Sequence, residues 1–420
     1  MPAAVLHTAG RTLHGKTELA DIVRLCQTQL HVESFSPAQR KAFGAIMACR
    51  TSKLGGHRFD CDDCGYQRYV YHSCRHRACP KCQTQARQQW VNDRKAELLP
   101  VPYFHLVFTL PHSLNPLIGW NEKNQRALLN LLFHTASRTL LEFGESRLHG
   151  MLGVTMVLHT WTQQLQTHYH IHCVVPAGAL SPDGTKWNAA GRKFLFPVHA
   201  LSKVFRAKYA EGLAALLLND GAKLDIPPHL VDAFASPDGI HDWIHHHLFS
   251  TPWVVYSQPP FGGPEKVLDY LSLYTHRTAI SNERIQSCVN GRVRFLWRDR
   301  RNDNELCSSV LSAIDFLKRF ASHVLPAGFM RIRHFGLLAN RGKTDRLNIC
   351  RTLMGVRVRI KASDDQPTAL QWLEEVSGLN ESICPCCQST LRITTIARFP
   401  EPMPRIDVLA RGSPTITDTS

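Results

Sequence analysis

The sequence lacks the long apolar segment that a membrane-spanning helix needs. No run of about 18 or more apolar residues occurs in the chain, and a helix must place roughly that many in a row to cross a bilayer. Residues 1–11 also lack the charged start and hydrophobic centre of a secretory signal. We therefore expect a cytoplasmic protein without a membrane-spanning helix.

Internal repeats and low-complexity tracts are missing too, apart from a polar tail after Pro402. Apolar residues make up 44% of the chain and charged residues 20%, which is typical of a globular protein with a substantial core. A length of 420 residues suggests two or three domains. We place their boundaries at 1–99, 100–300 and 301–420.

Acidic residues are outnumbered by basic ones. The chain has 34 Asp plus Glu against 49 Lys plus Arg, a net charge of +15, and its pI is near 9.3. Each cation that meets a phosphate releases condensed counterions, so an excess of this size favours a polyanionic partner. Nucleic acid is the first candidate and an anionic membrane surface the second.

The 14 cysteines gather at Cys-x-x-Cys spacings in a chain without an export signal, which indicates metal binding in a reducing compartment. Each pair can fold as a loop that points two thiolates at one Zn²⁺, and two pairs complete a tetrahedron. Free thiols are the alternative. The predicted ligands are Cys61, Cys64, Cys79 and Cys82, and either Cys74 or His76 could replace one of them.

A further pair, Cys384 and Cys387, lies near the C-terminus. No second pair is near it in the sequence, and Cys307 and Cys350 are the only distant partners that we identify. Whether this pair binds zinc stays open at this point.

Histidines alternate along one predicted strand, residues 168–175. Side chains on a strand alternate between its faces, so His168, His170 and His172 share one face at a spacing of roughly 7 Å. Two imidazoles so placed can grip one metal ion, although a run of core or surface histidines would look the same. The other motifs of the sequence must decide between a metal site and structural histidines.

Strands are also predicted at 103–110, 153–160 and 251–258, with helices at 125–143 and 200–218 and N-terminal helices within 17–49. This mixture predicts the α+β class: an antiparallel sheet with helices packed on it, preceded by an N-terminal helical zinc-binding domain. Pro264 can open a further helix, on which Tyr270 and Tyr274 lie one turn apart on the same face. The tyrosines could equally be packing residues.

Basic side chains recur beside these motifs. Arg292 and Arg294 follow a predicted Asn290-Gly291 hairpin turn, with Val293 and Phe295 on the opposite face; this ribbon could face DNA or be a solvated edge. Cations and aromatics around the cysteines also suit phosphate contact and base stacking. The DNA-binding candidates are Arg75, Arg77, Lys81, Arg277, Arg292, Arg294, Arg331 and Arg333.

Together these motifs resemble the insertion-sequence-91 family of rolling-circle transposases, over about residues 15–390. The cysteine block and the 270–281 segment carry most of the resemblance. The matching segments are Ser73-Cys74, Cys79-Pro80-Lys81-Cys82-Gln83, Leu158-His159-Thr160-Trp161, His170-Ile171-His172-Cys173, 270–281 and 331–340.

The resemblance implies a nuclease core like that of rolling-circle replication initiators and metal-dependent cleavage of one DNA strand. Tyr270 and Tyr274 would be the nucleophiles, forming a 5′-phosphotyrosine and a free 3′-OH. His170 and His172 would bind Mg²⁺ or Mn²⁺, with His159 as the third ligand.

Gln163, Gln164 and His168 are further candidates for the third position, and we assign His168 a supporting role. The implied partner is DNA, chiefly single-stranded or unwound element ends and target, and no membrane. The sequence leaves the oligomeric state unknown.

Three alternatives remain. A three-carboxylate transposase needs Asp and Glu converging on two metals, and no spacing here singles out such a trio. A zinc-dependent DNA-binding protein without catalysis would share the cysteines and the charge. A plasmid or phage replication initiator would share the histidines and the tyrosines.

Overall fold

The chain forms two compact units: unit 1 comprises 1–47 and 75–362, and unit 2 comprises 48–74 and 363–420. The structure is a computed structural model, which describes residues 17–32, 35–82, 90–95, 97–191, 194–218, 224–258, 278–299, 301–356, 380 and 382–397. This division differs from the three consecutive segments expected from the sequence, because unit 2 combines residues 48–74 with the C-terminal residues 363–420.

A seven-stranded sheet forms the centre of unit 1. Its order is β7-β6-β4-β5-β3-β8, and β12 also pairs with β4. The pairings are antiparallel, which confirms the predicted α+β class. The strands are β3 (Tyr103–Thr109), β4 (Met151–Trp161), β5 (Thr167–Pro176), β6 (Gly178–Leu180), β7 (Trp187–Ala189), β8 (Val255–Gln258) and β12 (Ile332–Gly336).

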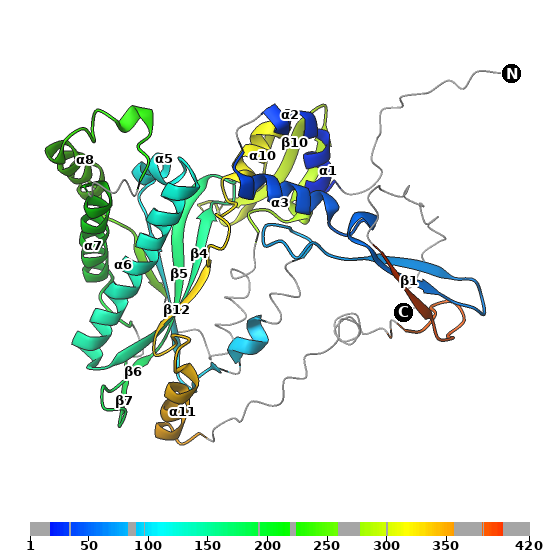
Figure 1. The fold of residues 1–420 in the computed structure, drawn as a ribbon. Helices are drawn as coiled ribbons and strands as arrows, with labels where there is room; N and C mark the ends of the chain where they lie inside the picture. The colour runs from blue at the N-terminus through cyan, green and yellow to red at the C-terminus, as the bar shows by residue number, and fades with distance from the viewer. Residues whose placement is uncertain are drawn as a thin grey trace. The chain divides into compact units, whose positions relative to one another are not determined.

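Three long helices cover one face of this sheet: α6 (Glu122–Leu148), α7 (Val198–Leu218) and α8 (Pro237–Phe249) (Figure 1). The Asn121 side chain caps α6 by accepting the N–H of Asn124 at 2.9 Å, which satisfies a donor that the first turn leaves open. Alternate residues of β5, including Tyr169 and Ile171, are fully buried in this core. Histidines at the positions between them therefore lie on the opposite face.

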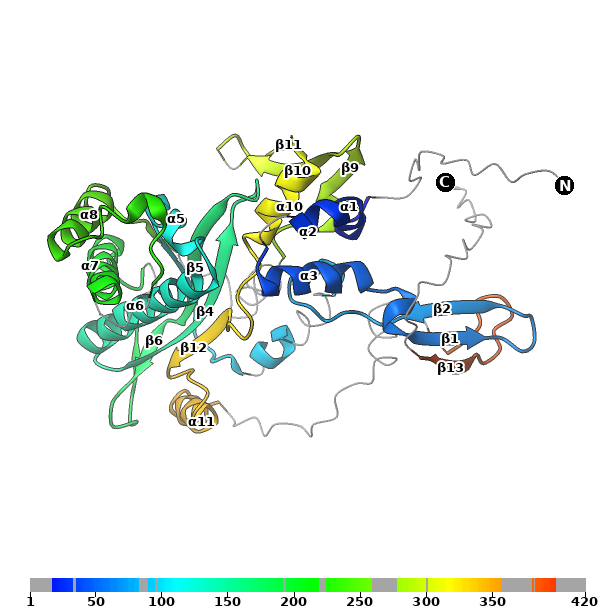
Figure 2. The ribbon, with the colours of Figure 1, turned by 45° about the horizontal axis from the view of Figure 1, so that its top comes forward.

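The N-terminal helices belong to unit 1 and lie near a second, three-stranded sheet of order β11-β10-β9 (Figure 2). The N–H of Leu19 donates to the Asn282 side chain at 3.1 Å, and the rings of Phe43 and Phe320 lie 6.3 Å apart. These helices thus pack against elements that lie more than 200 residues later in the sequence. The elements are α1 (Leu19–Leu25), α2 (Gln27–Val32), α3 (Pro37–Ala48), β9 (Ile285–Val289), β10 (Arg292–Asp299), β11 (Glu305–Ser312) and α10 (Ala313–Ala321).

The predicted hairpin turn is present between β9 and β10. Asn290 and Gly291 have φ of 49° and 69°, the left-handed conformation that this turn requires. Val293 and Phe295 are fully buried, and Arg292 and Arg294 are exposed, as the alternation predicts.

Unit 2 holds a three-stranded antiparallel sheet of order β13-β1-β2. The strands β1 (Gly56–Asp60) and β2 (Gln67–Tyr71) form a hairpin, and β13 (Arg392–Ile396) comes from the C-terminal part of the chain. The pairing of β13 with β1 explains why residues 48–74 and 363–420 share one unit.

Remaining described elements connect these parts. They are α5 (Asn115–Ile118), α11 (Lys343–Leu353) and the short 3₁₀ segments Ser52–Leu54, His112–Leu114, Pro228–Leu230 and Asn282–Arg284. Among the described residues, no helix is both long and apolar enough to cross a membrane.

Candidate functional site

Three imidazoles meet on the face of the sheet opposite the long helices. His159 on β4 and His170 on β5 are direct cross-strand partners, and His172 lies two residues further along β5. One ring nitrogen from each lies within 4.8 Å of the other two. His159 and His172 are buried and His170 is half-buried. The structure thus brings together the three histidines proposed from the sequence.

Hydrogen bonds set the orientation of two of these rings. His170 Nδ1 donates to the carbonyl oxygen of His168 at 2.9 Å, which leaves its Nε2 as the atom that can bind a metal. His172 Nδ1 lies 2.8 Å from Nε2 of His105. Nε2 is therefore also the candidate ligand atom of His172, and a ring with one nitrogen held by a hydrogen bond and the other directed at the metal is typical of metal-binding histidines.

The sequence analysis missed His105. It lies on β3, is 2% exposed and is the direct cross-strand partner of Gln258 on β8. Burial lowers the pKa of His105 to about 4, against a hydrogen bond with Gln258 that raises it, so the ring is neutral near pH 7 and its Nε2 can accept a proton from His172. A lone histidine inside the apolar run 103–110 was the available signal.

The other candidates for the third ligand lie differently. His168 pairs with His112 at 3.1 Å and is not part of the three-histidine group. Backbone carbonyls of Gln163 and Gln164 accept hydrogen bonds from Arg284 and Arg319. His159 therefore has the best position of the candidates.

The tyrosine helix lies outside the part of the chain that the structure describes. Residues 259–277 include Tyr270, Tyr274 and Arg277, so their roles stay predictions.

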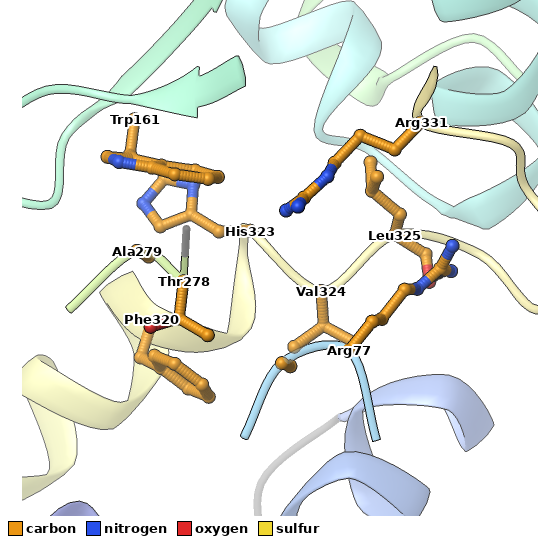
Figure 3. Close-up of a pocket in the computed structure, with 10 residues that line it drawn as sticks. Arg77, Trp161, Thr278, Ala279, Phe320, His323, Val324, Leu325 and Arg331 are labelled. Carbon is orange, nitrogen blue, oxygen red and sulfur yellow. Dashed lines mark hydrogen bonds between the residues drawn. The ribbon is translucent and has the colours of Figure 1, made fainter. Parts of the chain in front are cut away.

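A pocket of unit 1 adjoins the histidines through Trp161, whose ring stacks on His159 at 4.8 Å and 17°. Two guanidinium groups line it, those of Arg77 and Arg331 (Figure 3). Arg77 donates to the carbonyl oxygens of Leu325, Pro326 and Phe329 at 2.5–2.8 Å. These hydrogen bonds stabilise the loop before Arg331.

Arg331 is the second cation of this pocket. Burial and the charge of Arg77 lower the pKa of Arg331 to about 10, so it remains protonated near neutral pH. Arg331 therefore places a positive charge at the pocket wall, and Arg77 holds the neighbouring loop.

The cysteines group differently from the expectation. The sulfur atoms of Cys61, Cys64, Cys384 and Cys387, all in unit 2, lie within 4.8 Å of one another. This group differs from the predicted set of Cys61 and Cys64 with Cys79 and Cys82, because pairing of β13 with β1 brings the distant Cys384 and Cys387 to the first pair. Cys307 and Cys350 do not belong to this group.

The other candidate cations make intramolecular contacts or face outwards. Lys81 pairs with Glu18, and the Arg333 guanidinium lies 4.1 Å from the centre of the Phe133 ring. Arg75 is exposed, as are Arg292 and Arg294. The last two have the free, outward orientation that phosphate contact requires.

Carboxylates are absent from the groups of candidate ligands found among the described residues. A three-carboxylate centre needs Asp and Glu side chains that converge. Within the described part of the chain, the geometry therefore favours the histidine centre.

Comparison with protein families gives two matches. Residues 22–110 match a family described as "Transposase zinc-binding domain". Residues 153–345 match a family described as "Putative transposase". The first range includes the cysteine-rich hairpin, and the second includes all three histidines.

Two relatives are similar over most of the chain. The "Putative transposase y4qJ" of Sinorhizobium fredii is 41% identical over 382 residues, which cover 90% of this chain and 94% of that protein. The transposase for insertion sequence element IS801 of Pseudomonas savastanoi pv. phaseolicola is 31% identical over 302 residues, 70% of this chain and 69% of that protein.

Likeness to solved structures is weak. The conjugative relaxase TrwC in complex with mutant OriT DNA is 17% identical with a TM-score of 0.23, over 43% of this chain and 68% of that chain. Its metal-free complex with OriT DNA has a TM-score of 0.21 over the same shares.

Proposed function

Because this chain belongs to the insertion-sequence-91 family of transposases, we propose that it cleaves and rejoins single-stranded DNA at the ends of its mobile element. The observation that carries the proposal is the group of three imidazoles, His159, His170 and His172, on two neighbouring strands. The chain as a whole is basic, with a net charge of +15, which suits a DNA substrate.

The three histidines would hold a divalent ion, Mg²⁺ or Mn²⁺. The ring orientations support this assignment, since the held Nδ1 atoms of His170 and His172 leave Nε2 of each ring as the ligand. Nitrogen donors fit Mn²⁺ more readily than Mg²⁺, which prefers oxygen. When bound, such an ion polarises the scissile phosphate and stabilises the charge that develops on it.

Tyr270 and Tyr274 are the proposed nucleophiles. The Oη of one tyrosine attacks the scissile phosphorus, the bond from phosphorus to the 3′-oxygen breaks, and the phenol proton passes to water while the departing oxygen takes up a proton as the 3′-OH. A phenol with a pKa near 10 is a weak nucleophile at neutral pH, so a polarised phosphate is needed. The 5′-phosphotyrosine keeps the energy of the broken bond, and a 3′-OH can reverse the step without ATP.

A covalent adduct is the direct test. Single-stranded oligonucleotides covering both element ends, incubated with the protein and Mn²⁺ or Mg²⁺, should yield a protein–DNA adduct that survives a denaturing gel. The adduct should disappear with Tyr270→Phe plus Tyr274→Phe, and with His170→Ala plus His172→Ala, whereas DNA binding should remain in both. Tyr256→Phe, an exposed tyrosine on β8, and His112→Ala are the matched controls.

Other outcomes would decide between the alternatives. An adduct that persists in the double tyrosine variant contradicts the proposal, as does cleavage without an adduct, which a three-carboxylate enzyme would give. DNA binding without cleavage indicates a non-catalytic zinc protein. An adduct that never joins the two element ends indicates a replication initiator.

A further inference from the structure

We propose that Cys61, Cys64, Cys384 and Cys387 bind one structural Zn²⁺, which fastens the C-terminal segment 382–397 to the hairpin of β1 and β2. All four residues belong to unit 2. The family match for zinc binding ends at residue 110, so it does not include the second pair. This inference is independent of the proposed cleavage chemistry.

The distances between the sulfur atoms fit a tetrahedral site. Cys61 Sγ lies 3.4 Å from Cys387 Sγ, and Cys64 Sγ lies 3.5 Å from Cys384 Sγ, with all four within 4.8 Å. A zinc–sulfur bond of about 2.3 Å in a tetrahedron separates the sulfurs by roughly 3.8 Å. Shifts of a few tenths of an ångström would therefore accommodate the ion, while the distances are far too long for disulfides.

The two Cys-x-x-Cys loops have the same backbone conformation. In each loop the first cysteine donates its N–H to the carbonyl five residues later, and its own carbonyl accepts the N–H of the residue four later. The bonds are Cys61 to Tyr66 at 2.9 Å, Cys384 to Ser389 at 2.7 Å, Gly65 to Cys61 at 3.0 Å and Gln388 to Cys384 at 3.0 Å.

Left-handed residues close both loops at the same position. Gly65 has φ of 71° and Gln388 has φ of 66°. Glycine adopts this conformation without cost, whereas Gln388 adopts it against its preference. The two loops thus form the same turn from different sequences, and each directs two thiols at the same point. A zinc site built from two Cys-x-x-Cys loops requires this arrangement.

Among the residues of unit 2 that the structure describes, the apolar cluster around these cysteines is small. Its buried members are Phe59, Leu391 and two of the cysteines, Cys61 and Cys384, with Tyr66 packed against them. Modules with so little buried apolar surface usually depend on a metal or on disulfides. The exposed ion pair between Arg392 and Asp62 at 3.0 Å adds little, because such pairs are screened by water. A shared zinc ion would stabilise such a module directly.

Zinc content tests the assignment, with the neighbouring Cys386 as the control. Cys386 lies within the same motif, is exposed and is not part of the group. The full-length protein is purified and its zinc per chain measured by mass spectrometry. We expect Cys384→Ser plus Cys387→Ser to lose one zinc relative to the wild type, and Cys386→Ser to lose none. Equal zinc in the double variant and the wild type would overturn the proposal.

Thiol labelling uses only the wild-type protein, so the misfolding of a variant cannot affect the result. In the zinc-loaded protein an alkylating reagent should modify Cys386 at once and leave Cys61, Cys64, Cys384 and Cys387 protected. A chelator should then expose those four together. Labelling of Cys384 and Cys387 as fast as that of Cys386 contradicts a shared site, whatever the DNA-cleavage assay gives.

Discussion

His172 can offer only one ring nitrogen to a metal ion, because the other is bonded to His105. For Nε2 to be the ligand, Nδ1 must carry the proton and donate it to Nε2 of His105. This hydrogen bond between β5 and β3 thus fixes the tautomer of His172 and its ring orientation.

Replacing His105 with Phe should weaken metal binding without removing a ligand. The Phe ring fills the same space but accepts no proton from His172, so that ring is free to rotate and change tautomer. We expect the dissociation constant for Mn²⁺ to rise by about tenfold or more, measured by calorimetry or by the electron-spin signal of free Mn²⁺. His112→Phe, which alters the exposed pair with His168, should leave it unchanged; equal affinity in both variants would show that His105 has no positioning role.

The histidine pattern shows how far sequence reasoning reaches at this scale. Alternation along β5 places His170 and His172 on one face without any knowledge of the fold. The role of His105 could not be predicted in the same way, because its contact depends on the register between β3 and β5, which pairs His105 with Val174 and leaves His172 as the diagonal neighbour.

Among the elements, β12 illustrates how a titratable group can join a strand to a sheet. His334 on β12 lies opposite Thr155 on β4; its Nδ1 is 3.0 Å from the Thr155 hydroxyl, and Arg94 donates to its Nε2 at 3.0 Å. Glu97 forms ion pairs with Arg94 and with Lys343 beside it. Burial first, and then the charges of Arg94 and Lys343, lower the pKa of His334 to about 4.

This shift predicts a loss of stability in mild acid. The unfolded chain takes up the proton near pH 6.5, whereas the folded chain resists it until about pH 4, so the contribution of His334 is complete above about pH 6.5 and declines as the pH falls toward 4. Lowering the pH from about 7 to about 5 should reduce the free energy of unfolding of the wild type. His334→Gln keeps a donor and an acceptor but does not titrate, so we expect its reduction to be smaller by about 1 to 2 kcal/mol.

Urea unfolding at the two pH values measures this difference. Zinc loss and the other histidines affect wild type and variant alike, so they cancel in the comparison. The same pH dependence in both proteins would show that His334 does not titrate as the structure implies.

The cysteine pairs show what local sequence cannot supply for an element. The spacing predicts loops that present two thiols each, and the match to a transposase zinc-binding domain, residues 22–110, includes the first of them. Which loops lie together depends on β13 pairing with β1, a contact between residues more than 300 positions apart in the chain. Nearness in sequence suggested Cys79 and Cys82 as partners of Cys61 and Cys64, whereas strand pairing brings Cys384 and Cys387 to them.

For the molecule as a whole, the excess of positive charge has to be divided between cations that hold the fold and cations that can meet DNA. Arg77 and Arg333 are engaged within unit 1, by backbone carbonyls and by the Phe133 ring. Arg292 and Arg294 point outwards from β10, whose other face is buried. The net charge of +15 predicts nucleic-acid binding, but only the fold separates these two groups.

Removing Arg292 and Arg294 together should reduce the salt dependence of DNA binding. Each phosphate contact on a single strand contributes about 0.7 to the slope of log affinity against log salt, because it releases condensed counterions. If both arginines contact phosphates, the double Ala variant should bind more weakly at low salt with a slope smaller by about 1.4, measured by fluorescence anisotropy over a range of salt concentrations. Arg138→Ala, an exposed arginine of α6 paired with Glu142, is the control. An unchanged slope in the double variant would place the DNA on another face of the molecule.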